Sequence, residues 1–180
     1  ATTGTLRVAG RLEAVRGTSW MDHEFFSSDL DTTLIGWDWF SLQLDDDSEL
    51  MLYRLRRAGG AVSGWASGTY VTPAGSSLSL RGQDFSVDAT ARWTSPTTRV
   101  IYPAAWTVRL PELGLDLSVA PTVPDQELDT RATTGVIYWE GSVSVTGTRR
   151  GRPVRGQGYV ELTGYDGQVP MKSPPGTAPR

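Results

Sequence analysis

The fold is decided by residues 36–55, which read GWDWFSLQLDDDSELMLYRL. Residues 37–44 alternate with a period of two, which is typical of a β-strand with one buried face. Trp37, Trp39, Ser41 and Gln43 fall on one face, and Asp38, Phe40, Leu42 and Leu44 fall on the other. The short polar side chains of 45–48 suit a tight turn. Residues 49–56 therefore return as the partner strand of an antiparallel hairpin.

Working outward, the rest of the chain repeats this pattern in short segments. Candidate strands lie at 5–8, 11–15, 68–72, 77–80, 85–93, 106–110, 115–119, 136–145 and 157–165. No helical period exceeds about two turns, and 20 glycines and 11 prolines indicate many turns. We therefore predict an all-β fold, an antiparallel up-and-down β-barrel of about 8–10 strands. The barrel domain would span 1–168, and the Pro-rich tail 169–180 would be extended or disordered.

Composition excludes several classes of function. A chain of 180 residues suits one domain. Its net charge of −3 argues against a nucleic-acid partner. Cysteine is absent and histidine occurs once, as His23, so thiolate or poly-histidine metal sites are not expected. No apolar run reaches the roughly 18 residues of a membrane span. We predict no metal, no organic cofactor and no transmembrane segment.

Carboxylates interleaved with tryptophans are the best functional signal, because the two side chains have opposite solvation preferences. In the cluster 20–25, alternation places Trp20, Asp22 and Glu24 on one face. Apolar surroundings raise the pKa of a carboxyl group, which can then donate a proton at neutral pH. Aromatic faces stabilise a nearby cation. The candidate acids are Asp22, Asp38, Glu24 and Glu140, and the candidate ligand-binding residues are Trp20, Trp37, Trp39, Tyr53, Tyr138 and Trp139.

A structural interpretation of the same residues stands beside this one. Buried carboxylates in β-barrels are more often held by arginine than used as acids, and Arg54, Arg56 and Arg92 are available. Large aromatic residues dominate β-cores whatever the function. His23 falls on the face opposite Asp22, which makes an Asp–His pair within one strand unlikely to form.

Five motifs carry a family resemblance, namely 20–24 (WMDHE), 36–44 (GWDWFSLQL), 49–55 (ELMLYRL), 138–141 (YWEG) and 158–165 (GYVELTGY). In this order they resemble the carotenoid 1,2-hydratase / AttH-like lipocalin family over roughly Thr5 to Tyr165. The resemblance implies a lipocalin-like barrel, and this chain looks like the C-terminal of two such halves. It also implies a hydrophobic polyene or isoprenoid-like ligand and a role in acid-catalysed hydration or cyclisation. A periplasmic, secreted or membrane-associated location is weakly favoured.

Two alternatives to an enzyme remain open. The chain could be a carrier without chemistry, or a scaffold barrel that completes a two-barrel protein whose catalytic groups lie elsewhere. An open apolar cavity with an unpaired carboxylate favours the enzyme. Carboxylates that are all held by arginine favour the carrier, and a filled interior favours the scaffold.

Overall fold

A computed structural model describes residues 2–21, 33–59, 61–62, 64–133 and 135–167. The predictions for Asp22, Glu24 and the tail 169–180 concern residues outside these ranges, as does His23. Within the described residues, no helix has the length and apolar character needed to cross a membrane.

The described residues are almost entirely β-structure, as the period-two patterns predict. The elements are β1 (Thr2–Val8), β2 (Arg11–Gly17), β3 (Leu34–Leu44), β4 (Glu49–Arg57), β5 (Ser67–Val71), β6 (Ser77–Arg81), β7 (Ser86–Thr94), β8 (Ile101–Leu110), the 3-10 turn η1 (Pro111–Leu113), β9 (Leu115–Pro121), β10 (Glu127–Asp129), β11 (Ile137–Arg149) and β12 (Arg152–Thr163).

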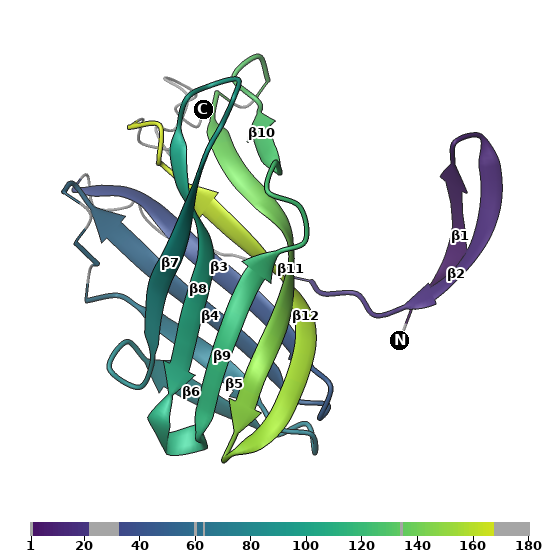
Figure 1. Ribbon diagram of the computed structural model, residues 1–180, viewed down its shortest axis with the longest axis vertical. Helices are drawn as coiled ribbons and strands as arrows, with labels where there is room; N and C mark the ends of the chain where they lie inside the picture. Colours follow the sequence, from purple (N-terminus) through teal and green to yellow (C-terminus); the bar gives the residue numbers. More distant parts are fainter. Residues whose placement is uncertain (1, 22–32, 60, 63, 134, 168–180) are drawn as a thin grey trace, which may run out of the picture.

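Ten of these strands form one curled antiparallel sheet in the order β6-β5-β4-β3-β12-β11-β9-β8-β7, with β10 added beside β11 (Figure 1). Apart from β10, strands that are neighbours in the sheet are also neighbours in the chain, and the last strand, β12, returns to pair with β3. The sheet ends at β6 and β7. The predicted lipocalin-like up-and-down barrel is thus confirmed, as a curled half-barrel whose ladder stops between β6 and β7.

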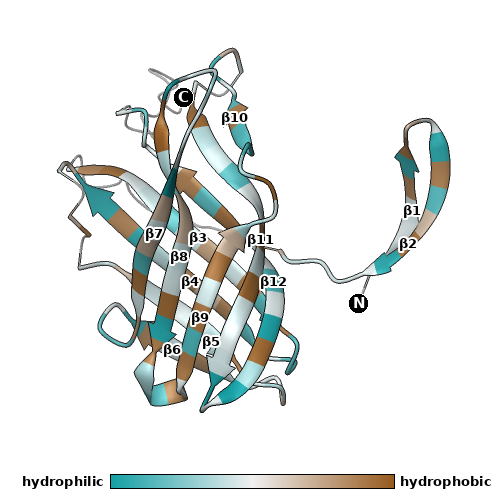
Figure 2. Cartoon of the chain, viewed as in Figure 1, coloured by the Kyte–Doolittle hydropathy of each residue, from teal (hydrophilic) through white to brown (hydrophobic). Residues whose placement is uncertain are grey.

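Inward-facing residues fill the hollow of the curled sheet. Apolar and polar residues alternate along its strands (Figure 2). Phe40 from β3 packs edge-on against Trp106 from β8, with ring centroids 5.4 Å apart. Trp106 in turn contacts Trp139 from β11 at 6.3 Å. The core cluster also holds Leu42, Leu50, Leu52, Tyr70, Tyr102, Val108, Leu117, Val143 and Val160, all at most 1% exposed. Burial of this apolar face supplies the main driving force for folding.

Strand β11 changes partner along its length, and this change sets the position of Glu140. Its register with β9 runs from Arg149 to Val143, whereas β10 pairs with residues 137–139. Gln126 bridges the interval: its amide oxygen accepts a hydrogen bond from the Ser142 N–H at 2.8 Å, and its amide nitrogen donates to the Ser142 carbonyl at 3.1 Å. The side chain thus substitutes for a neighbouring strand.

The hairpin predicted at 5–8 and 11–15 is confirmed, but it is not part of the barrel. Strands β1 and β2 pair only with each other, in a separate two-stranded sheet. Figure 1 shows this hairpin standing apart from the large sheet.

Candidate functional site: a groove of carboxylates and tryptophans

Strand β3 divides the candidate residues between two environments. Asp38 points inward and is fully buried, whereas Trp37 and Trp39 are half-buried on the opposite, outer face. This division matches the predicted alternation. The interior and the outer face are therefore two separate sites.

Asp38 is held by two arginines inside the barrel. Arg54 Nη2 lies 2.7 Å from one carboxylate oxygen, and Arg56 Nε lies 2.9 Å from the other. The Tyr165 hydroxyl also donates to Asp38 at 2.9 Å, and the Arg56 guanidinium lies 3.8 Å from the centre of the Tyr165 ring. A carboxylate with no water around it needs this compensation.

This geometry corrects the expectation that Asp38 would lie in an apolar wall without a cationic partner. The interior face of β3 and β4 brings two of the three arginines considered, Arg54 and Arg56, directly onto it. For Asp38 the structural interpretation is therefore the one that the contacts support.

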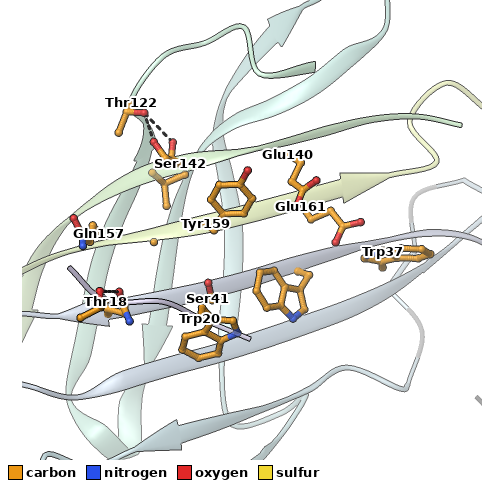
Figure 3. Close-up of a pocket in the computed structure, with 14 residues that line it drawn as sticks. Thr18, Trp20, Trp37, Ser41, Thr122, Glu140, Ser142, Gln157, Tyr159 and Glu161 are labelled. Atoms are coloured by element: carbon orange, nitrogen blue, oxygen red, sulfur yellow. Dashed lines mark hydrogen bonds between the residues drawn. The ribbon is translucent and has the colours of Figure 1, made fainter. Parts of the chain in front are cut away.

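On the outer face, a groove of about 740 Å³ runs across β3, β12 and β11 (Figure 3). Its lining includes Trp37 and Trp39 from β3, Tyr159 and Glu161 from β12, and Glu140 from β11. Figure 3 shows the two glutamates side by side on neighbouring strands, with an aromatic ring near each. The groove thus joins acidic groups to broad aromatic surfaces.

The sheet register explains how these side chains meet. Glu140 lies directly opposite Glu161, Glu161 lies opposite Trp39, and Trp39 lies opposite Tyr53. Directly opposed residues share a face with Cβ atoms about 5 Å apart. Like charges in this position destabilise a sheet, so the juxtaposition of two glutamates calls for a functional explanation.

Burial is the main influence on the pKa of Glu140. Burial raises the pKa of the Glu140 carboxyl, and a hydrogen bond from Tyr138 partly opposes this increase. In Tyr159 and Tyr138 the pKa is raised as well, first by burial and then by the negative charges of Glu140 and Glu161. A half-buried carboxyl group that resists ionisation is suited to donate a proton.

The segment that follows the hairpin closes one side of the groove. Trp20 packs edge-on against Trp39, with ring centroids 6.3 Å apart. The Thr18 hydroxyl donates to the Gln43 side-chain oxygen at 3.1 Å. Residues 18–20 therefore cross the outer face of β3 and form a wall of the groove.

The groove contains Trp20, Trp37, Trp39 and Glu140 from the predicted set. Tyr53 and Tyr138 lie on the same face but outside its lining. Trp139 lies on the other face, 1% exposed in the core, where its indole N–H donates to the Pro124 carbonyl at 2.9 Å.

Sequence reasoning left Glu161 and Tyr159 out of the candidate site. Their alternation within 157–165 was visible, but the facing of Glu161 on Glu140 depends on the β11–β12 register. The candidate strands at 136–145 and 157–165 contain the signal that could have found them, because a hairpin that pairs Arg149 with Arg152 places position 140 opposite 161.

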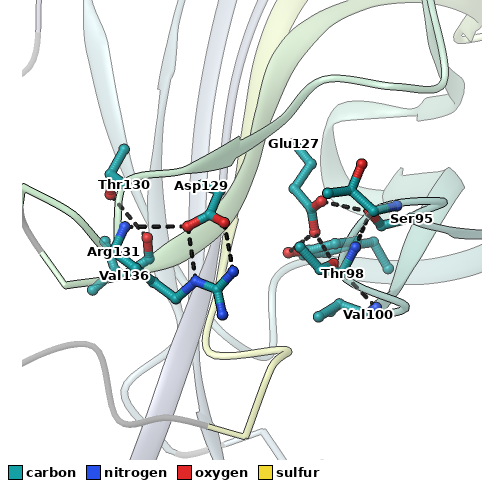
Figure 4. A network of polar contacts seen from close by, with 10 residues as sticks. Ser95, Thr98, Val100, Glu127, Asp129, Thr130, Arg131 and Val136 are labelled. Carbon is teal, nitrogen blue, oxygen red and sulfur yellow. Dashed lines mark hydrogen bonds and ion pairs between the residues drawn. The ribbon is translucent and has the colours of Figure 1, made fainter.

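Another carboxylate, Glu127, belongs to a separate polar network (Figure 4). It accepts hydrogen bonds from the hydroxyls of Ser95 at 2.5 Å, Thr98 at 2.6 Å and Tyr102 at 3.0 Å. These bonds fasten β10 to the loop between β7 and β8. Three hydroxyl donors on one carboxylate indicate a structural role.

Metal ligands do not gather in the described part of the chain: it contains no group of three or more His, Cys, Asp or Glu side chains placed to hold an ion.

The curled meander and its packed interior define the class of the protein, a lipocalin-like β-barrel. The AttH-like family model matches residues 1–165, so the chain belongs to the AttH-like family. The crystal structure of an AttH protein from Nitrosomonas europaea is similar, with a TM-score of 0.80 and 38% identity over 91% of this chain and 49% of that one. Kievitone hydratase from Nectria haematococca shares the fold, with a TM-score of 0.67 and 20% identity over 91% of this chain and 51% of that one.

The chain therefore spans about half the length of the solved structures that it matches. A search of curated proteins finds no match.

Proposed function

We propose that the outer-face groove binds an elongated, apolar, unsaturated molecule, and that the Glu140–Glu161 pair supports acid-catalysed hydration or cyclisation of its alkene in the longer protein. The observation that carries the proposal is the direct facing of two glutamates on a half-buried, tryptophan-lined surface. Membership of the AttH-like family and the fold shared with a hydratase are consistent with it.

The chemistry uses the groups that line the groove. Glu140, whose pKa is raised by burial, donates its proton to one alkene carbon, and the π electrons form the new C–H bond. The cation left on the other carbon faces the indole rings of Trp37 and Trp39, which stabilise positive charge. Water adds to this cation and releases a proton to the second carboxylate, Glu161. In a cyclisation, the π electrons of a second double bond of the same substrate form a C–C bond to this cation instead, and the new cation loses a proton to Glu161.

The non-catalytic alternative is supported by two features of the barrel interior. Asp38 is paired with arginine and the core is filled by side chains, and both features fit a scaffold. They concern the inward face, however, and leave the outer groove unexplained.

Turnover of an acyclic isoprenoid alkene such as farnesol tests the proposal in the full-length protein. Glu140→Gln should lower kcat by about 10²-fold or more, the usual contribution of a general acid, while substrate affinity changes little. Glu161→Gln should lower kcat less, because water can accept the final proton. Glu49→Gln, on the outer face of the neighbouring strand β4, is the matched control. Full activity of Glu140→Gln would refute the assignment.

A further inference from the structure

The β1–β2 hairpin has no packing partner in the described part of the chain. All seven residues of each strand are exposed, and neither strand pairs with the large sheet. An isolated two-stranded hairpin is at best marginally stable in water. A partner is therefore needed to hold this segment in the conformation that its sequence encodes.

One face of the hairpin carries three apolar side chains, which lie beside the ion pair of Arg11 and Glu13. Leu6, Val8 and Val15 are 56%, 57% and 38% exposed. The register pairs Gly4 with Val15 and Leu6 with Glu13, so these three apolar side chains point to the same side. Leu12 pairs with Arg7 and points to the opposite side. Contiguous exposed apolar residues of this kind mark an interaction surface.

The comparisons suggest which kind of partner this surface fits. The family model begins at residue 1 and so includes the hairpin. The AttH relative is covered over only 49% of its length. The hairpin is thus part of the family's sequence pattern, although neither of its strands pairs with the large sheet.

We propose that the β1–β2 hairpin docks, through Leu6, Val8 and Val15, on an apolar surface of the second half of the longer protein. Residues 18–20 continue directly from the hairpin into the wall of the groove. A second half held by the hairpin would therefore stand beside the mouth of the groove. The hairpin is a connection between the halves, and this role does not depend on the reaction proposed for the groove.

Hydrogen–deuterium exchange tests this proposal on the 180-residue chain and on the same chain joined to its second half. The amides of residues 2–17 should exchange at least 10²-fold more slowly in the joined protein, while those of β3 and β12 should be protected in both. Equal exchange of residues 2–17 in the two proteins would overturn the proposal.

The Leu6→Asp/Val15→Asp double variant of the joined protein should lose at least tenfold of that protection, and Leu12→Asp on the opposite face should keep it. Both variants should leave the barrel's melting temperature unchanged, since the hairpin lies outside the core. Equal effects of the two variants would overturn the apolar face as the contact. A 180-residue chain that sediments as a dimer, and becomes a monomer with the double variant, would assign the surface to a second copy and overturn the second-half proposal.

Discussion

Asp38 and Glu140 are both carboxylates beside tryptophans, but they face opposite sides of the same sheet. Asp38 is fully buried and carries two guanidinium groups and a tyrosine hydroxyl. Glu140 is half-buried, its partner is Tyr138, and its pKa is raised by burial. The inner carboxylate is paired with opposite charge, whereas the outer one is partly buried and tends to keep its proton. Sequence context alone therefore does not distinguish a structural carboxylate from a candidate acid.

The largest expected effect comes from breaking the inner site. Asp38→Asn leaves Arg54 and Arg56 buried without a counter-charge, which should cost about 3–5 kcal/mol of folding free energy. Urea denaturation measures this loss. Asp116→Asn is the control, because its side chain is 61% exposed and should change stability by less than about 0.5 kcal/mol. A loss below about 1 kcal/mol for Asp38→Asn would contradict the structural role.

The aromatic wall of the groove should have the next largest effect. Trp39→Ala removes the ring that contacts Trp20 and should weaken binding of a conjugated polyene by about tenfold, or about 1.4 kcal/mol. Quenching of tryptophan fluorescence by the polyene measures the affinity. Trp65→Ala is the control, since Trp65 is 66% exposed and does not line the groove. Equal losses in the two variants would argue against the groove as the binding site.

Weakening the Glu127 network should cost less stability than breaking the Asp38 site. Glu127→Gln keeps the shape but removes the charge that accepts three hydroxyl hydrogen bonds, and it should lower stability by about 1–2 kcal/mol. Thermal unfolding measures the change, with Glu112→Gln in the exposed turn η1 as control. Turnover at the groove should be unaffected, because this network lies outside it. Loss of turnover in a stable Glu127→Gln variant would show that the network belongs to the active site.

The smallest expected effect is the pH dependence of Glu140. Its pKa is raised above the ordinary value of 4.5, so the folded protein retains a proton that the unfolded chain releases. The contribution of Glu140 to stability is therefore fully present below 4.5 and is lost as the pH rises through the raised pKa. Glu140→Gln should flatten this slope in pH-dependent denaturation. Under the proposed mechanism, wild-type turnover should decline over the same pH range, because Glu140 loses the proton that it has to donate to the alkene. An unchanged slope in the variant would show that Glu140 titrates normally.

The sequence by itself determined the local properties of this protein. Alternation in 37–44 placed Asp38 and Phe40 on one face and Trp37 and Trp39 on the other, because successive residues of a strand point to opposite sides. Turn residues at 45–48 marked the β3–β4 hairpin, and the absence of helical periods established the fold class. These features depend on neighbouring residues only.

Only the tertiary structure decided which faces meet. Tyr165 reaches Asp38 across 127 residues of sequence, and Trp39 lies opposite Glu161 because β12 returns to pair with β3. Pairing between distant strands depends on how the whole sheet closes, and a shift of one residue would reverse every face. The Tyr165 hydrogen bond to Asp38 and the facing of Trp39 and Glu161 follow from this long-range register, for which the local pattern carries no signal.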